Sequence, residues 1–467
     1  MSADQTQRKL WAPRAWLMRD GVGSFQEGVE LGIDARGYWS SIATHAACPP
    51  SAERLDGPIL PGMVDAHSHA FQRAFAGLAE RRDASDDDFW SWRDRMYRVA
   101  LQIEPDMLEA IASQLYVELL CGGYTDVCEF HYLHHASDGS SYTDPLAMCR
   151  ALANAATRTG IGLTILPVLY ERAGFMQPLL RDDQRRFATN VERVLKLRDG
   201  VRAMDLPLVK AGTAVHSLRA AQPVSIAGLQ AALAGDRAPI HIHVSEQQRE
   251  VDECVAATRM RPIEWLAEHV ALDSRWQLVH ATHATIEEIN AVARAGAGIV
   301  LCPTTEANLG DGVPDLPRWL DAGVPIALGS DSNVTRDWPD EIRHLEYAQR
   351  LQLQARNVGA RPHRGSPSTA ETLLAQALDG GRHAAGRVAW GFEVGARADL
   401  VVLDESSEAL MGVPPQLAID ALTFSGPSRP FRHVMVAGEW RIRDGRSQDE
   451  AAIAAAFRQA MRVLWSD

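Results

Sequence analysis

The chain has 467 residues, of which 46% are hydrophobic, and its 47 basic and 60 acidic side chains give a net charge of -13. This length suits a barrel with an accessory domain, and the acidic balance argues against nucleic acid or an anionic membrane as a partner. Six scattered cysteines without a paired pattern predict reduced thiols. No secretory signal and no apolar run of about 18 residues is evident, so we expect a cytoplasmic protein.

Short apolar segments separated by glycine and polar residues predict strands near both ends of the chain. The amino-terminal segments are KLWAPRAWL and VELGIDARGYW, and the carboxyl-terminal ones are ADLVVLD and HVMVAGEWRIRDG, the last turning at Ala437-Gly438. We expect the two ends to form one discontinuous β-sandwich domain. Its parts are residues 1–57 and 391–467, the second including a terminal helix, and they enclose a central domain at residues 58–390.

The central domain alternates strand-like runs with helical patterns. One helical pattern, residues 105–123, has apolar spacing near 3.6 and stops at Gly122 and Gly123. Eight such alternations predict an α/β fold, a (β/α)8 TIM-type barrel. The eight predicted strands lie within residues 59–69, 125–135, 161–170, 206–218, 239–246, 276–284, 296–306 and 325–333.

Polar side chains stand where six of these runs end, which is where TIM-type barrels place their active sites. Residues two apart in a strand face the same side, so the two histidines in PGMVDAHSH would point toward one place. A pair of core histidines bonded to the backbone is the alternative. The residues at the six ends are His67 and His69, His131, His216, His243 and Glu246, His280, and Asp331.

Three histidines and one aspartate, His67, His69, His243 and Asp331, are suitable ligands for one Zn²⁺, and Mn²⁺ or Fe²⁺ would also accept them. A bound metal lowers the pKa of water toward about 7. His241 shares a face with His243 but lies farther from the strand end, so we expect it to pack. Asp331 could alternatively cap a helix, although its neighbours could serve there instead.

Proton transfer to a leaving group needs a further carboxyl group, and Glu246 lies three residues after His243. We expect Glu246 to be the catalytic proton shuttle, with a plain salt bridge as the alternative. His280, in LVHATH, could orient the attacking water together with Asp331, or stabilise developing charge.

The segments PGMVDAHSH, HVSE, VHATH, GSDSN and GARADLVVLD together resemble the amidohydrolase superfamily over nearly the whole chain. The resemblance implies a barrel holding one or two metals, and the pairing of His243 with Glu246 resembles the mononuclear deaminase branch. Dinuclear members carry a carbamylated lysine on the fourth strand. Lys210 lies six residues before His216, which is too early to reach the metal, so we favour one metal.

Four longer segments, HSHAFQRAFAGLAERR, FWSWRDRMY, VHSLRA and CPTTEANLGDG, are similar to the N-formimino-L-glutamate deiminase family. The resemblance implies hydrolysis of the formimino group to N-formyl-L-glutamate and ammonia in histidine degradation, and a homodimer. Such a substrate carries two carboxylates, which arginine binds in a bidentate fork. Arg93 and Arg219 match the positions that the resemblance suggests, in segments that we place in loops.

Three more residues are candidates for substrate binding. Gln72 and Tyr132 could hydrogen-bond the substrate, or they could simply pack. The resemblance implies that His216 contacts the substrate rather than the metal. For the arginines the alternative is surface ion pairing, for example with Asp94.

Two other functions remain open. A related deaminase acting on a nucleobase or another cyclic amidine would need ring-stacking groups and less positive charge. A catalytically inactive barrel could serve as a binding or scaffold subunit, although such a role would not require the histidine and carboxylate set.

Overall fold

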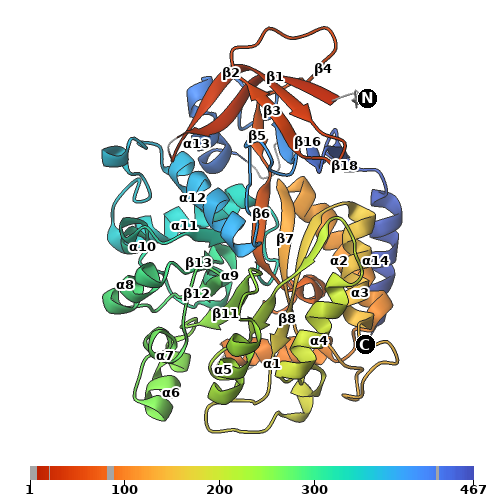
Figure 1. The fold of residues 1–467 in the computed structure, drawn as a ribbon, viewed down its shortest axis with the longest axis vertical. Helices are drawn as coiled ribbons and strands as arrows, with labels where there is room; N and C mark the ends of the chain where they lie inside the picture. The colour runs from red at the N-terminus through yellow and green to blue at the C-terminus, as the bar shows by residue number, and fades with distance from the viewer. Residues whose placement is uncertain (1–7, 20, 81–88, 427–430, 467) are drawn as a thin grey trace.

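The computed structural model describes residues 8–19, 21–80, 89–426 and 431–466. It contains a parallel barrel and a separate sheet built from both ends of the chain (Figure 1). The predicted fold is therefore confirmed. Arg81 and Arg82, which end one of the segments quoted above, lie outside the described residues.

The barrel consists of eight parallel strand positions in sequence order, which match the eight predicted runs, except that the second strand begins one residue before its run, at Tyr124. The fourth run forms two short strands, because the regular strand pairing is interrupted at Gly212. A parallel bridge between Ser68 and Asp331 joins the first and last strands. The strands are β6 Met63–Ser68, β7 Tyr124–His131, β8 Gly162–Leu169, β9 Val209–Ala211 with β10 Thr213–Val215, β11 Ile240–Val244, β12 Trp276–His280, β13 Gly298–Leu301 and β14 Ile326–Leu328.

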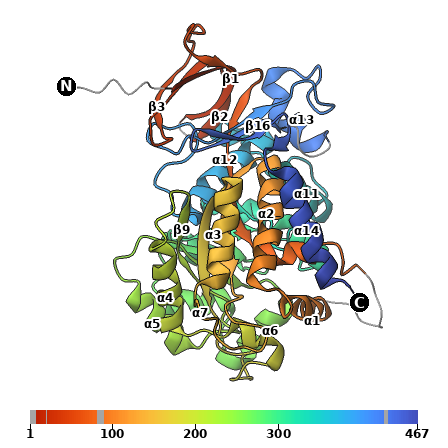
Figure 2. The same cartoon turned by 90° about the vertical axis from the view of Figure 1, so that its right-hand side faces the viewer.

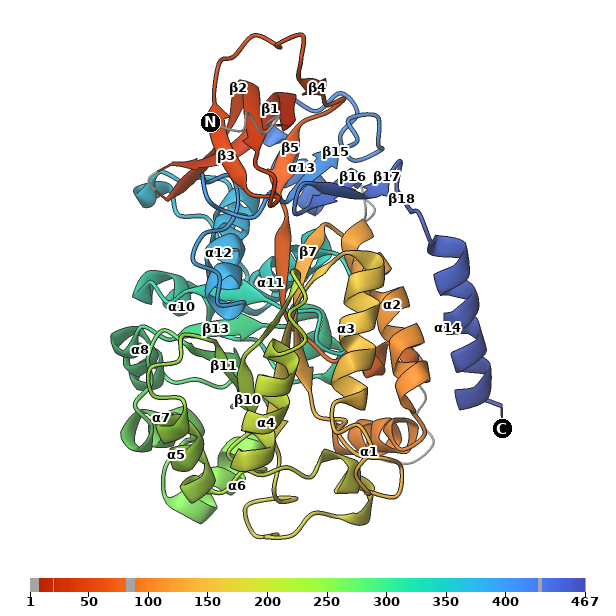
Figure 3. The same ribbon diagram turned by 45° about the vertical axis from the view of Figure 1, so that its right-hand side comes forward.

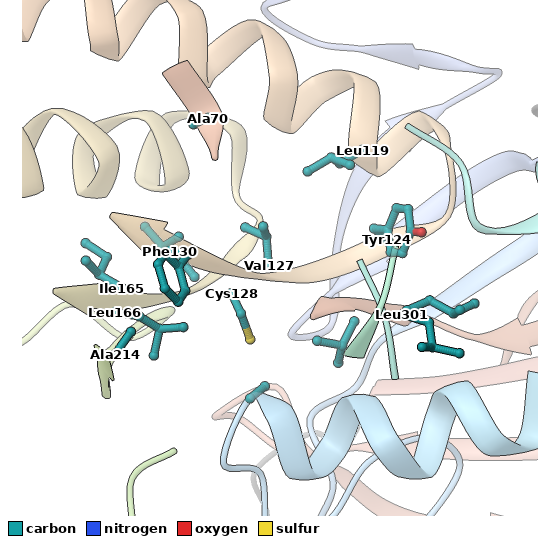
Figure 4. Close-up of a cluster of buried hydrophobic side chains, with 14 of the residues drawn as sticks. Ala70, Leu119, Tyr124, Val127, Cys128, Phe130, Ile165, Leu166, Ala214 and Leu301 are labelled. Carbon is teal, nitrogen blue, oxygen red and sulfur yellow. The ribbon is translucent and has the colours of Figure 1, made fainter. Parts of the chain in front are cut away.

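Side chains of the barrel strands alternate between the helical layer and the barrel interior, as the pleat requires. Figure 4 shows this for β7, where Val127 points toward Leu119 of the covering helix while Cys128 points the opposite way. Phe130, two residues after Cys128, therefore also faces inward, and its ring lies 4.3 Å from that of His243. Burial on both faces explains why these strands read as nearly continuous apolar runs.

Fourteen α-helices lie among the described residues, and most cover the barrel. The predicted helix at 105–123 is observed as Pro105–Cys121, ending at Gly122. The helices are α1 Phe89–Ala100, α2 Pro105–Cys121, α3 Ala147–Thr159, α4 Val191–Arg202, α5 Pro223–Ala232, α6 Gln248–Thr258, α7 Pro262–His269, α8 Ile286–Ala295, α9 Pro303–Leu309, α10 Leu316–Ala322, α11 Trp338–Leu353, α12 Thr369–Ala384, α13 Ala418–Phe424 and α14 Glu450–Leu464.

The second sheet joins strands from both chain ends in the order β18-β17-β16-β15-β5-β1-β2-β3, with β4 beside β1. The strand β5 pairs with β15 and β1, so this sheet continues past the predicted boundary at residue 57. The turn at Ala437-Gly438 joins β16 to β17 as predicted. The strands are β1 Arg8–Arg19, β2 Val22–Ile33, β3 Trp39–Ala43, β4 Glu53–Arg54, β5 Ile59–Pro61, β15 Leu400–Leu403, β16 Phe431–Val436, β17 Glu439–Arg443 and β18 Arg446–Ser447.

The small sheet sits at the end of the barrel where β6 begins (Figure 1). The terminal helix α14 leaves this sheet and runs along α2 on the outside of the barrel (Figures 2 and 3). The carboxyl ends of the barrel strands therefore face away from the small sheet, toward α1, α5 and α6. None of the helices that the structure describes is long and apolar enough to cross a bilayer.

The contact between α12 and β14 depends on the absence of a side chain at Gly380. A Cβ atom there would overlap the backbone of Ile326, whereas one at Gly228 of α5 would meet only Val191 at 3.9 Å. We expect Gly380→Ala to lower the free energy of unfolding by about 1–3 kcal/mol or more, as overpacking does. Gly228→Ala, a helical control, should raise it by up to about 1 kcal/mol. Urea denaturation measures both, and equal stabilities would contradict this packing.

Candidate active site

Three histidines converge at the carboxyl end of the barrel. His67 lies in β6, His69 directly after it, and His243 in β11, and their ligand atoms all lie within 4.8 Å of one another. All three are buried. The Nε2 atoms of His67 and His243 are 3.0 Å apart. Strand alternation puts His67 and His69 on one face. Both rings therefore lie close to the ring of His243, which comes from the fifth strand.

Backbone carbonyls fix the orientation of two of these rings. Nδ1 of His69 lies 2.9 Å from the carbonyl oxygen of Phe130, and Nδ1 of His243 lies 3.0 Å from that of His216. A carbonyl can only accept, so both Nδ1 atoms carry the proton and both Nε2 atoms keep a lone pair. This arrangement is the usual support for a metal-binding histidine.

Asp331 completes the cluster from the segment after β14. Its Oδ1 atom lies 3.4 Å from Nε2 of His67 and 3.3 Å from Nε2 of His69. Asp331 has a left-handed backbone, with φ of 48°. Its amide donates to the carbonyl of His67 at 2.8 Å, and its own carbonyl accepts from the amide of His69 at 3.1 Å. These bonds hold a conformation that would otherwise be costly.

The charge states of these groups suit a divalent cation. Burial lowers the pKa of His67 to about 3 and also lowers the pKa of His69 and of His243, so the rings are neutral at pH 7. Burial opposes ionisation of Asp331, but the hydrogen bond from His67 and the nearby histidines outweigh it and hold its pKa below the usual value. The Nε2 atoms of His67 and His243 are close enough together for both to bind one ion. The donor set therefore fits a metal.

A second group of polar side chains borders the cluster. Nε2 of His280, which ends β12, lies 3.6 Å from Oε1 of Glu246 and 3.8 Å from Oδ2 of Asp331. Burial raises the pKa of Glu246. Burial also opposes the charged form of His280, but the carboxylates of Glu246, Glu306 and Asp331 outweigh it and raise its pKa. The pair can therefore hold protons near neutral pH.

Two acidic residues in this group escaped the sequence analysis. Glu306 of α9 accepts the amide of Cys302 at 2.8 Å, and its Oε1 atom lies 3.4 Å from Nδ1 of His280. Asp311, buried beside Glu246 and His280, accepts a hydrogen bond from Gln247. Both belong to the quoted segment CPTTEANLGDG. The sequence did contain a signal for Glu306, because this carboxylate follows soon after the end of a predicted strand.

The cluster opens into a cavity of about 50 Å³. Gln72 and Tyr132 lie on its wall, where Nε2 of Gln72 donates to the Tyr132 hydroxyl at 3.2 Å. His216 joins them between β10 and α5. Arg93 and Arg219 also line the cavity. Arg93 lies on α1, which corrects its expected place in a loop: the segment FWSWRDRMY forms a helix whose buried side carries the arginine.

Both arginines have buried donors with nothing to bind. Nε of Arg93, and Nε and Nη1 of Arg219, meet no hydrogen-bond partner in the part of the chain that the structure describes. Arg93 is 9% exposed and Arg219 is 6% exposed. The acid considered as an alternative partner, Asp94, lies 3.8 Å from Arg93 and is half exposed. Unpaired buried guanidinium donors are costly, so an anion in this cavity would be stabilised by them.

Four other polar residues lie outside the cluster. His131 faces His134 and Cys149 on the helical side of β7, because Phe130 takes the inward position. His241 packs with its Nε2 atom 2.9 Å from the carbonyl of Ala384. The remaining two are Lys210, which lies near Arg387 and Arg397, and His283, whose Nε2 donates to the carbonyl of Asp311 at 2.9 Å.

Two histidines of the same strand provide a matched test of the metal site. We expect His243→Asn to reduce zinc affinity by more than the 10–100-fold that loss of an outer partner causes, since a ligand itself is removed. His241→Asn should retain the full metal content. Both contents are measured by atomic emission after dialysis against a zinc buffer, with circular dichroism to confirm folding. Equal metal content in the two variants would exclude His243 as a ligand.

Known proteins resemble this chain along most of its length. The model of the family described as "Amidohydrolase family" matches residues 59–441. The chain is 45% identical to formimidoylglutamate deiminase of Pseudomonas aeruginosa, covering 97% of this chain and 99% of the relative. It is 28% identical to 8-oxoguanine deaminase of the same species, covering 89% of this chain and 90% of that relative. A crystal structure of an amidohydrolase from Brucella melitensis has a TM-score of 0.91 and 41% identity, covering 98% of this chain and 100% of that one. The chain therefore belongs to the amidohydrolase family, which is metal-dependent.

Proposed function

We propose that the protein hydrolyses N-formimino-L-glutamate to N-formyl-L-glutamate and ammonia, a reaction of histidine degradation. The observation that carries this proposal is the cavity that the histidine cluster shares with two arginines, whose buried donors have no partner among the described residues. The relative with 45% identity is named for this activity. A small dicarboxylate is the substrate class that such a cavity suits.

One Zn²⁺ is the metal that we propose, held by His67, His69, His243 and Asp331. Three nitrogen donors and a carboxylate form a set that zinc accepts, and another divalent ion could replace it. When bound, the metal lowers the pKa of water and so provides a nucleophile near neutral pH.

The chain's own groups then move protons. The oxygen of water adds to the formimino carbon, while His280 orients the water and Asp331 accepts its proton. Glu246, whose pKa is raised by burial, carries a proton to the departing nitrogen. The carbon–nitrogen bond breaks, ammonia leaves, and the formyl carbonyl forms. Glu306 accepts from Nδ1 of His280 and thereby directs Nε2 toward the reacting atoms.

The other end of the cavity binds the carboxylates. Arg93 and Arg219 offer bidentate donors, while Gln72, Tyr132 and His216 offer hydrogen bonds along the wall between them and the metal cluster. This orientation places the cationic formimino group beside Glu246 and Asp331, where its charge is favourable.

A nucleobase deaminase is the competing function, since a relative with 28% identity is named for 8-oxoguanine. A neutral ring would leave the guanidinium donors of Arg93 and Arg219 unpaired, which disfavours this alternative. A scaffold role would not require the buried histidine cluster, which disfavours that alternative as well.

The direct test is to incubate zinc-loaded protein with N-formimino-L-glutamate and follow ammonia release, with N-formimino-L-aspartate and guanine alongside. Fast release from the glutamate compound alone supports the proposal. Ammonia release from guanine would contradict the assignment of this substrate. So would the absence of release from both formimino compounds while metal is bound.

Arg219 provides a test of carboxylate recognition. We expect Arg219→Gln to lower kcat/KM about 100-fold or more, because a buried charge-assisted pair is lost. Arg219→Lys should recover only part of this loss, since lysine lacks the planar fork. Arg294→Gln, on the exposed side of α8, serves as control. Steady-state kinetics with N-formimino-L-glutamate measures all three, and a fully active Arg219→Gln protein would refute the role.

The role of Glu306 is tested through its conservative variant. We expect Glu306→Gln to lower kcat about 10-fold with KM and zinc content unchanged, because an amide holds His280 more weakly than a carboxylate does. Glu287→Gln, an exposed site on α8, is the control. A change in KM or zinc content alone would instead indicate a purely structural role.

A further inference from the structure

A second and larger cavity adjoins the one that holds the histidine cluster. It has a volume of about 520 Å³ and lies between α1, the segment after β8, and α6. Its rim includes Met176, which is 85% exposed, so it opens to solvent. Arg93 and Arg219 line both cavities. The proposed carboxylate-binding residues therefore form the boundary between an inner and an outer space.

One aromatic ring organises this boundary. The guanidinium carbons of three arginines lie close to the ring of Trp90, Arg93 at 4.5 Å, Arg219 at 5.4 Å and Arg249 at 4.4 Å. Trp90 lines the outer cavity, whereas its neighbours Phe89 and Trp92 line the inner one. Cation–π contacts hold a guanidinium group without using its N–H donors, so those donors stay available to an anion.

The outer cavity is cationic although the protein as a whole carries a net charge of -13. Arginines 93, 181, 219 and 249 line it, and Glu253 is the single acid among the described residues that line it. Glu253 pairs with Arg249 at 2.8 Å, and Arg181 pairs with Asp94 at 3.1 Å and with Asp183. The arginines shared with the inner cavity have no such close partner among the described residues. A positive mouth in an acidic protein concentrates small anions at this point.

We propose that the outer cavity is a capture site for small carboxylates on their way to the inner cavity, and that Trp90 is the positioning residue that separates the two spaces and holds Arg93 and Arg219 in place. This inference rests on the proposed function and adds a binding step to it. Arg249 meets the anion first, at the solvent side. The carboxylates then transfer to the two inner arginines, which are already positioned by the indole ring.

Arg249 tests the capture step. At low ionic strength we expect Arg249→Gln to lower kcat/KM for N-formimino-L-glutamate about 3–10-fold with kcat unchanged, and the difference to vanish near 0.5 M NaCl as the charge is screened. Arg294→Gln should match the wild type at every salt concentration. Arg249→Gln kinetics identical to wild type at low salt would overturn the capture site.

Trp90 tests the positioning step. We expect Trp90→Phe to remain close to wild type because it keeps an aromatic face, and Trp90→Leu to raise KM about 5–10-fold with little change in kcat. Zinc content should stay constant in both. Equal KM values for the leucine and phenylalanine variants, or a loss confined to kcat, would overturn the role of Trp90.

A binding measurement separates this inference from the proposed function. Calorimetric titration of the zinc-loaded protein with N-formyl-L-glutamate needs no turnover. If the wild type shows no ammonia release yet binds this dicarboxylate more tightly than Arg249→Gln does at low salt, the substrate assignment fails and the capture site stands. Equal binding by wild type, Arg249→Gln and Arg294→Gln, together with normal turnover, leaves the reaction intact and removes the capture site.

Discussion

Closure of the barrel between its first and last strands is the constraint on which the candidate site depends. The seam consists of backbone bonds that Asp331 makes to His67 and His69, and of the bonds that Asp65 accepts from Ser330, from its amide at 2.9 Å and from its hydroxyl at 2.6 Å. The same bonds that close the barrel therefore set the separation between three of the proposed metal ligands. A site built on such hydrogen bonds is more rigid than one carried by surface loops.

The close approach at the seam also explains its local sequence. A Cβ atom at position 329 would lie 2.7 Å from Cβ of His67, so the last strand can reach the first only through glycine there. Asn333, also left-handed, donates from Nδ2 to the carbonyls of His69 and Asp331, both at 3.1 Å. The segment GSDSN thus combines barrel closure with ligand placement.

The sequence was sufficient to predict the barrel and the gathering of polar residues at one of its ends, because both follow from strand periodicity and from the parallel arrangement. It was harder to predict which side of a strand each side chain faces. His131 ends β7 just as His280 ends β12, yet it faces outward because Phe130 takes the interior position. Glu306 was missed because its contact with His280 joins two different strand ends, and the helix α1 was missed because its apolar residues sit among charged ones. The contact between Glu306 and His280 is not visible in local spacing.

Charges of both signs border the inner cavity. Carboxylates of Glu246, Glu306, Asp311 and Asp331 lie around His280, and Arg93 and Arg219 also line the cavity. Each group is largely removed from water, so a ligand must replace the lost hydration with its own charges. A molecule that is cationic at one end and anionic at the other satisfies both ends only in one direction. In the proposed reaction that direction puts the amidine beside the groups that move protons, so the charges that bind the ligand would also orient it for hydrolysis.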